Sequence, residues 1–219
     1  TATEATADNP SAVYIHPAGN TQWEGHHWRL GASLVRPGND SKTLEGQKPS
    51  ADSDLQFVPQ AYYVYSPQDS PWSFGFGLYA PFGLGADWGS DTPFTTKAEE
   101  ATLVYLSFNP VVAYQVNECL SIAAGLAIDY SDVDFKQSTI PGGIGRFKYE
   151  GDDVNLGFTL GVLYQPNEHW SFGINYRSPN EMEYEGSSWV HIPGLVSPEV
   201  KTSTDASLDY PQYIDVGVS

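Results

Sequence analysis

Few residues of this sequence have the spacing that catalysis or metal binding requires. His26 and His27 are adjacent, which suits neither a zinc site nor a catalytic dyad. Cys119 is the only cysteine, so it has no partner for an internal disulfide or a CxxC metal motif. No Ser-His-Asp set, nucleophile elbow or carboxylate pair has usable spacing. We therefore expect no enzymatic activity, no cofactor and no metal site.

An acidic segment runs from Asp129 to Asp134, with carboxylates also at position 132. Its D-x-x-D-x-D spacing falls short of a calcium-binding loop. Carboxylates in a ligand path would repel an anionic headgroup, so this segment favours uncharged ligands. A solvated loop face is the simpler interpretation of the same residues.

Charge and composition exclude several classes of protein. Lys and Arg total 10 and Asp and Glu total 27, which gives a net charge of −17 and a field that repels nucleic acid. No stretch approaches the roughly 18 uninterrupted apolar residues of a membrane-spanning helix. Fourteen Tyr and ten Phe beside 21 Gly and 16 Pro are instead typical of strands and turns. The composition predicts an all-β protein without a nucleic-acid partner.

Strict two-residue alternation, the side-chain period of a strand, recurs along the chain. In each clear segment one face is large and apolar while the other is small or polar, as in Ser73, Gly75 and Gly77. Weaker versions begin near Trp28, Phe57, Val104 and Ile214, which makes about eight strands in all. The clear apolar faces are Trp72, Phe74, Phe76, Leu78; Leu120, Ile122, Ala124, Leu126, Ile128; Val154, Leu156, Phe158, Leu160, Val162; and Trp170, Phe172, Ile174, Tyr176.

Two features favour a membrane barrel, with its apolar face toward lipid, over a soluble sandwich. Aromatic residues recur at strand ends, as interfacial girdles require. Short turns at 67–71, 117–118 and 166–169 alternate with long polar segments at 37–54, 83–100, 131–149 and 178–207. Outer-membrane barrels have short periplasmic turns and long external loops. We therefore expect the ends marked by Trp28, Trp72 and Trp170 to be periplasmic.

The segment before the first expected strand neither alternates nor shows a helical stripe. It reads ADNPSAVY over residues 7–14 and continues into His16-Pro17-Ala18-Gly19. Two prolines and a glycine make it a kinked chain whose polar groups must be satisfied by its surroundings. We interpret residues 1–24 as a plug inside the barrel and residues 25–219 as barrel wall.

These pieces give the sequence a resemblance to the FadL/TodX family of outer-membrane transporters of hydrophobic compounds. Besides ADNPSAVY and a near-NPAG motif, the matching pieces are YAPFGLG at 79–85, Asp87-Trp88, Asn109-Pro110 with Val112-Ala113-Tyr114, residues 125–134, and LYQPNEHWSFGINYRS at 163–178. They occur in family order from end to end of the chain.

The resemblance implies a 14-stranded transmembrane antiparallel β-barrel with an N-terminal hatch in its lumen. About eight strands are present, so we interpret the chain as the N-terminal part of a longer barrel. The family's third strand has an inward kink that opens a lateral exit. The corresponding residues here are Phe82, Gly83, Leu84 and Gly85, and an ordinary glycine-rich loop entry is the alternative.

The resemblance also assigns hatch residues, namely Asn9, Pro10, His16, Pro17 and Ala18. His16 stands where the family usually has Asn, and a buried histidine bonded to the backbone is the simpler interpretation of it. Arg29 and Arg177 lie in the lumen-facing register. Either arginine could hold a ligand headgroup or tie the hatch to the wall, and the structural role is preferred.

The function that the resemblance implies is passive uptake of hydrophobic small molecules, namely long-chain fatty acids, hydrocarbons or aromatics. Capture at external loops, an internal apolar pocket and a lateral exit through the kinked third strand are its expected steps. Outer-membrane lipid and lipopolysaccharide would be the other partners of a monomeric protein in the bacterial outer membrane. The alternative is a structural or adhesive barrel that binds a surface partner through its loops, for which a lumen plug has no evident use.

Overall fold

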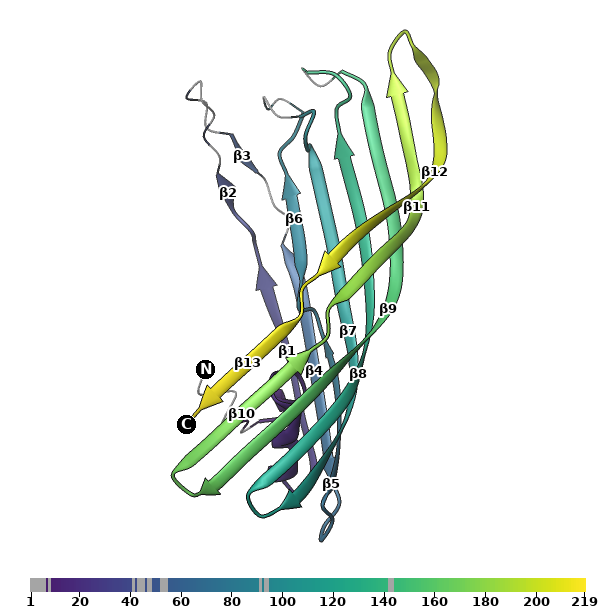
Figure 1. Cartoon of the computed structure of the whole chain (residues 1–219). Helices are drawn as coiled ribbons and strands as arrows, with labels where there is room; N and C mark the ends of the chain where they lie inside the picture. Colours follow the sequence, from purple (N-terminus) through teal and green to yellow (C-terminus); the bar gives the residue numbers. More distant parts are fainter. Residues whose placement is uncertain are drawn as a thin grey trace.

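The computed structural model describes residues 7, 9–40, 42, 46, 49–51, 55–90, 92, 95–141 and 144–219. A single antiparallel sheet curves around a short N-terminal segment (Figure 1). The sheet makes eight passes between two ends. Its strands are β1 (Gly25–Val35), β4 (Gln56–Ser66), β5 (Trp72–Tyr79), β6 (Gly83–Asp87), β7 (Glu100–Asn117), β8 (Leu120–Gln137), β9 (Arg146–Asn167), β10 (Trp170–Arg177), β11 (Asn180–Ile192), β12 (Val196–Tyr210) and β13 (Tyr213–Val218).

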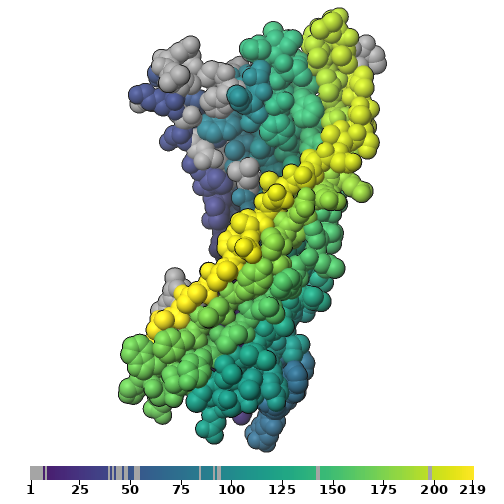
Figure 2. All heavy atoms as spheres, viewed as in Figure 1, coloured from purple at the N-terminus to yellow at the C-terminus, as the bar shows by residue number. Residues whose placement is uncertain are grey.

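Three of the passes consist of two strands each, because the chain leaves the ladder briefly between β5 and β6, between β10 and β11 and between β12 and β13. The order across the sheet is β1-β4-β5-β7-β8-β9-β10-β13, with β6 beside β7 and β11 between β9 and β12. No ladder joins β1 to β12 or β13 among the described residues, so the sheet is open. The last pass crosses the visible face obliquely (Figure 2). The strands β2 (Asn39–Asp40) and β3 (Ser50–Ala51) form a separate small sheet.

The two faces of the sheet differ as the alternation predicts. Leu126, Phe158 and Phe172 are exposed on the convex face, whereas Ser73 and Thr159 are buried on the concave face. The all-β fold, the outward apolar face and the count of about eight passes are thus confirmed. Among the described residues, no helix is both long enough and apolar enough to span a membrane.

The strands extend further than the sequence indicates. The segment 178–207, expected to be a loop, instead contains β11 and most of β12, which pair from Asn180↔Tyr210 to Ile192↔Val196. Here the large buried side chains are Met182 and Tyr184, which lie between the buried polar residues Asn180 and Ser188, and the outward side chains include Glu183. The large apolar side chains thus point inward and the charged ones outward, which is the reverse of the pattern in a lipid-facing segment. Judged by the lipid-facing pattern, the sequence of this strand therefore looks like a polar loop.

The described part of the N-terminal segment, residues 7 and 9–24, lies against the concave face near the short turns (Figure 1). We call this segment the hatch. It contains one α-helical turn, α2 (Ala12–Ile15), and a 3-10 helix, η1 (Pro17–Gln22). Small residues of the wall make room for it. An ideal Cβ built on Gly75 would lie 2.6 Å from Asn20 Nδ2 and 2.8 Å from Val13 Cγ2. Residues 1–6 and 8 of the expected plug lie outside the described residues.

Candidate functional site

The wall has an interruption between the first half of β4 and β6. The ladder between β4 and β5 covers only Ala61↔Leu78 to Tyr65↔Phe74, although β1 pairs with β4 as far as Gln56. Strand β6 pairs with β7 alone among the described strands. Residues 56–60 of β4 and 83–87 of β6 therefore face each other without a ladder, and we call this interruption the gap.

The chain conformation at the start of the gap follows from its sequence. The last pair of β5 with β7 is Tyr79↔Ser107, and the first pair of β6 is Gly83↔Val104. Three residues, Ala80-Pro81-Phe82, thus stand opposite two, which is a β-bulge that bends the strand. Pro81 has no N–H to donate to a ladder.

The four residues expected at the kink do not all lie in the bulge. Phe82 lies within the bulge, whereas Gly83, Leu84 and Gly85 lie beyond it in β6. These three residues are paired with β7 and face β4 without a ladder. The interruption of the strand itself covers Ala80–Phe82, immediately before Gly83.

A cavity of about 280 Å³ occupies the gap. Its lining includes Phe57 and Val104, which are 66% and 39% exposed on the convex face. It also includes Leu103 and Tyr105, which pack in the interior. Residues from both faces of the wall therefore line this cavity. The remaining lining residues are Val35, Pro37, Gln56, Val58, Pro59, Ala80, Pro81, Phe82, Gly83, Gly85 and Leu106.

An aromatic cluster lies on the inner side of the gap. Its buried members are Tyr105, Tyr149, Met182, Tyr184 and Tyr210, from β7, β9, β11 and β12. Their hydroxyls have partners in or beside the cluster. Tyr184 Oη lies 2.8 Å from Ser131 Oγ and 3.2 Å from Tyr210 Oη, and Tyr105 Oη accepts from Asn180 Nδ2 at 3.0 Å. The cluster therefore presents tyrosine rings and the side chain of Met182 beside the gap, next to the buried polar residues Asp129 and Asn180. Sequence reasoning missed these residues, and their only signal is the inward alternation of Met182 and Tyr184. Partly buried Phe82, Leu103, Val133, Phe135 and Phe147 pack against them.

The hatch docks below this cluster through buried contacts. His16 is fully buried, and its Nε2 lies 3.1 Å from the backbone oxygen of Val162 on β9. Burial lowers the pKa of His16, because the charged imidazolium loses its hydration. Pro17 and Ala18 pack against the wall, where an ideal Cβ on Gly161 would lie 3.3 Å from Pro17 Cγ. The residues expected in the hatch from Asn9 to Ala18 are thus brought together against one face of the sheet.

Both arginines contact the hatch. Arg29 Nη1 donates to Asn9 Oδ1 at 2.7 Å. The Arg177 guanidinium lies 5.0 Å from the ring centre of Tyr14 and donates from Nη2 to Tyr79 Oη at 2.6 Å. The Arg29–Asn9 bond and the Arg177–Tyr14 contact join the hatch to the wall, whereas the Arg177–Tyr79 bond joins β10 to β5 within the wall.

A family model described as "Outer membrane protein transport protein (OMPP1/FadL/TodX)" matches residues 1–219. The chain belongs to this family. It is 24% identical over 206 residues to the 47 kDa outer membrane protein of Pasteurella multocida (strain Pm70), a match covering 86% of this chain and 48% of the relative. It is 20% identical over 211 residues to the long-chain fatty acid transport protein of Escherichia coli O6:H1, covering 83% and 47%. The chain spans about half the length of these curated relatives.

Solved FadL/TodX structures have the same fold. A FadL homologue of Pseudomonas aeruginosa superposes with a TM-score of 0.75 and 17% identity, over all of this chain and 64% of that chain. The toluene transporter TodX of P. putida gives 0.73 and 16%, over 96% and 62%. The chain is thus an outer-membrane β-barrel protein whose eight passes form an open part of a barrel sheet. Membership in a family of transport proteins agrees with the expectation that it is not an enzyme.

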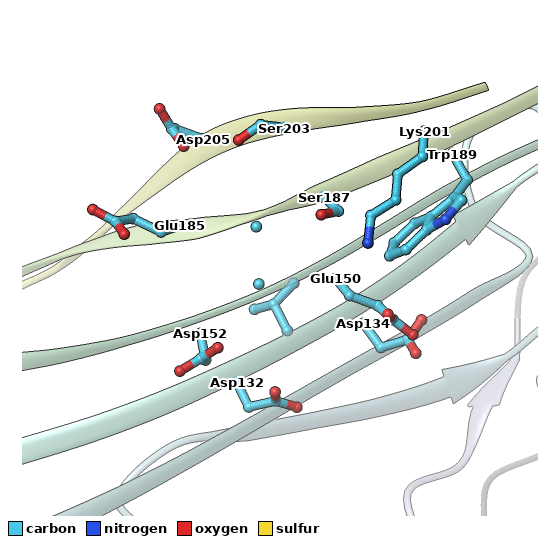
Figure 3. A pocket seen from close by; sticks show the side chains of 13 residues that line it. Asp132, Asp134, Glu150, Asp152, Glu185, Ser187, Trp189, Lys201, Ser203 and Asp205 are labelled. Atoms are coloured by element: carbon cyan, nitrogen blue, oxygen red, sulfur yellow. The ribbon is translucent and has the colours of Figure 1, made fainter.

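The acidic segment of this FadL/TodX protein divides between the two faces of the wall. Val133 packs in the interior, so Asp132 and Asp134 point outward. They line a surface pocket of about 690 Å³ with Glu150, Asp152 and residues of β11 and β12 (Figure 3). The expectation that these carboxylates repel an anionic ligand is therefore wrong for Asp132 and Asp134, because they lie outside the lumen. Only Asp129 faces inward, where its Oδ2 accepts from Asn180 Nδ2 at 2.8 Å.

Cations partly neutralise the outer pocket. Lys148 forms ion pairs with Asp134 at 3.7 Å and with Glu150. Lys201 lies 4.8 Å from the ring centre of Trp189, and Figure 3 shows its chain running beside that ring. No group of three or more metal-ligating side chains has metal-binding geometry in the described part of the chain. The pocket is therefore a charged outer surface rather than part of a path through the wall.

Proposed function

We propose that the protein provides a passive path for hydrophobic small molecules from the outside into the outer membrane. The observation that carries this proposal is the cavity in the gap, whose lining includes residues of both faces of the wall at a place where no ladder joins the described residues of β4 and β6. A solute that reaches the apolar interior leaves sideways between β4 and β6 and enters lipid without crossing the periplasmic end, where the hatch lies. In an intact ladder the backbone groups of the two strands would occupy this route.

The names of the relatives indicate the class of solute. Two curated relatives are named long-chain fatty acid transport proteins, and two similar structures are described as a toluene transporter and a monoaromatic hydrocarbon channel. What these solutes share is an apolar body. The aromatic cluster, with Tyr105 and Met182 buried beside the gap, offers a matching internal surface. We propose fatty acids, hydrocarbons and aromatics as the substrate class, captured first at the external loops.

The two arginines serve the hatch in this proposal. Arg29 bonds Asn9, and Arg177 stacks on Tyr14 and bonds Tyr79, so each holds the plug against the wall. Neither arginine is needed to hold a carboxylate headgroup. A monomer in contact with outer-membrane lipid and lipopolysaccharide completes the proposal.

A reversible disulfide across the gap tests the exit route. An ideal Cβ on Gly85 would lie 3.8 Å from Gln56 Cγ, the position that the sulfur of a cysteine at residue 56 can take, so two cysteines here face each other across the gap within reach of a disulfide. The variant carries Gln56→Cys and Gly85→Cys with the native Cys119→Ser. Oxidation should stop uptake of radiolabelled toluene and oleate by cells, and dithiothreitol should restore it.

A matched pair controls for cross-linking itself. Phe74 and Val112 are paired on the lipid-facing side of the intact β5–β7 ladder, away from the gap. Phe74→Cys with Val112→Cys, in the same Cys119→Ser background, should leave uptake unchanged when oxidised. Full uptake by the oxidised Gln56–Gly85 variant would overturn the proposed exit.

A further inference from the structure

Phe82 lies where two interrupted passes of the wall meet. Its ring lies 5.2 Å from the ring of Tyr105 and 4.8 Å from that of Tyr210, with Tyr213 at 6.2 Å. Tyr210 ends β12 and Tyr213 begins β13, so these two flank the interruption of the eighth pass. A side chain of the third pass therefore reaches across the interior to the eighth.

The same residue lines the cavity in the gap. Its backbone belongs to the bulge Ala80–Phe82 and has no ladder partner on either side among the described residues. Its ring is only partly buried and packs against the cluster from outside it. The ring thus lies where the aromatic cluster meets the cavity in the gap, on a stretch of the wall that has no ladder partner among the described residues.

We propose that Phe82 is the gate of the lateral exit and sets the girth of the solutes that pass. This inference rests on the proposed function, since a gate requires a path. In the closed position the ring is held by Tyr105 and Tyr210. A passing solute displaces the ring toward the cavity, and a wide solute requires a larger displacement than a slender one.

The ring contacts set the size of the expected effect. Aromatic pairs of this kind each change an equilibrium by roughly two- to tenfold. Loss of the two closest pairs should therefore raise the fraction of open gate by about tenfold. Phe82→Ala removes the pairs and widens the path, whereas Phe82→Trp keeps an aromatic ring and narrows it.

The test compares ethylbenzene, which has one ring, with pyrene, which has four fused rings, in uptake by cells carrying the full chain. Phe82→Ala should raise pyrene uptake by about tenfold and ethylbenzene uptake by less, because the slender solute needs a smaller displacement, so the ratio of pyrene to ethylbenzene uptake should rise; Phe82→Trp should lower the ratio. Phe76→Ala is the matched control, because Phe76 forms a ring pair with Phe108 at 4.3 Å on the intact part of β5. That variant should leave the ratio unchanged.

Two measurements separate the alternatives. Thermal unfolding identifies variants that fail to fold, and Phe82→Leu, which keeps an apolar side chain, then replaces Phe82→Ala. The Gln56–Gly85 disulfide identifies a failure of the exit itself, since it would then leave uptake by the parent protein unchanged. If the disulfide blocks uptake but the solute ratio is the same in all Phe82 variants, the proposal of a lateral exit is supported and the proposal that Phe82 is its gate is overturned.

Discussion

A lysine at Leu126 should destabilise the protein strongly, because the structure places this side chain near the middle of the lipid-facing band. Leu126 is 57% exposed on the convex face. It lies six residues above Leu120, where β8 begins, and four below the interfacial Tyr130. At about 3.3 Å per residue and a strand tilt of about 40°, these spacings correspond to roughly 15 Å and 10 Å along the membrane normal.

These distances together match an apolar band about 25 Å tall, so Leu126 lies well inside it. A lysine at such depth costs about 2–4 kcal/mol, and one near the interface costs about 0–1 kcal/mol. Val154 provides the matched control, because it is 59% exposed on the same face and pairs with Tyr130 at the aromatic level. We expect Leu126→Lys to cost about 2–3 kcal/mol more than Val154→Lys.

The assay is urea unfolding of the protein from phospholipid bilayers, followed by tryptophan fluorescence. With the m-value unchanged, the difference appears as a lower midpoint for Leu126→Lys. Equal midpoints for the two variants would refute the assignment of the convex face to lipid or the depth of Leu126 within it.

Three further predictions concern the hatch. Gly75→Ala should cost about 1–3 kcal/mol, because the new Cβ would lie 2.6 Å from Asn20 Nδ2, and an unchanged melting temperature in detergent would contradict this packing. Burial lowers the pKa of His16, so between that lowered pKa and the ordinary value of 6.5 only the undocked state is protonated; docking should weaken as the pH falls below 6.5. Hydrogen exchange of residues 12–22 should therefore speed up at acidic pH in the parent and less so in His16→Asn; an equal response in both would exclude His16 as the cause. Arg177→Met should raise the same exchange more than Arg29→Met, because Arg177 stacks on a hatch ring and is the less exposed of the two, and the reverse order would count against this role.

The faces of the wall could be predicted from sequence because lipid imposes a simple rule. Within the band, Phe158 and Leu126 must face outward, while small residues such as Gly161 face the hatch. Beyond the band the outward face meets water, so β11 combines outward Glu183 with inward Tyr184. Aromatic residues such as Tyr130 and Tyr176 mark where the lipid-facing band ends, but the lipid-facing pattern also ends there, which is why the sequence of the continuing strand predicts a loop.

The gap and the hatch contacts depend on partners that are distant in the chain. Phe82 packs on Tyr210, and His16 bonds the backbone of Val162, 146 positions later. Local alternation gives no information on such pairs. The family resemblance indicated a kink near Phe82, but only the three-dimensional structure shows that no ladder joins the described residues of β4 and β6.

Photolabelling tests the central claim, lateral exit between β4 and β6, most directly. A diazirine-bearing hydrocarbon is activated in outer-membrane vesicles, and its adducts are mapped by mass spectrometry. Lipid-facing Leu126 serves as the reference for label dissolved in the bilayer. We expect adducts on the inward residues of the gap, Leu103 and Phe82, and we expect excess toluene to reduce them by competition. Adducts confined to Leu126 and other lipid-facing residues, or found instead on Val13 and His16 of the hatch, would contradict it.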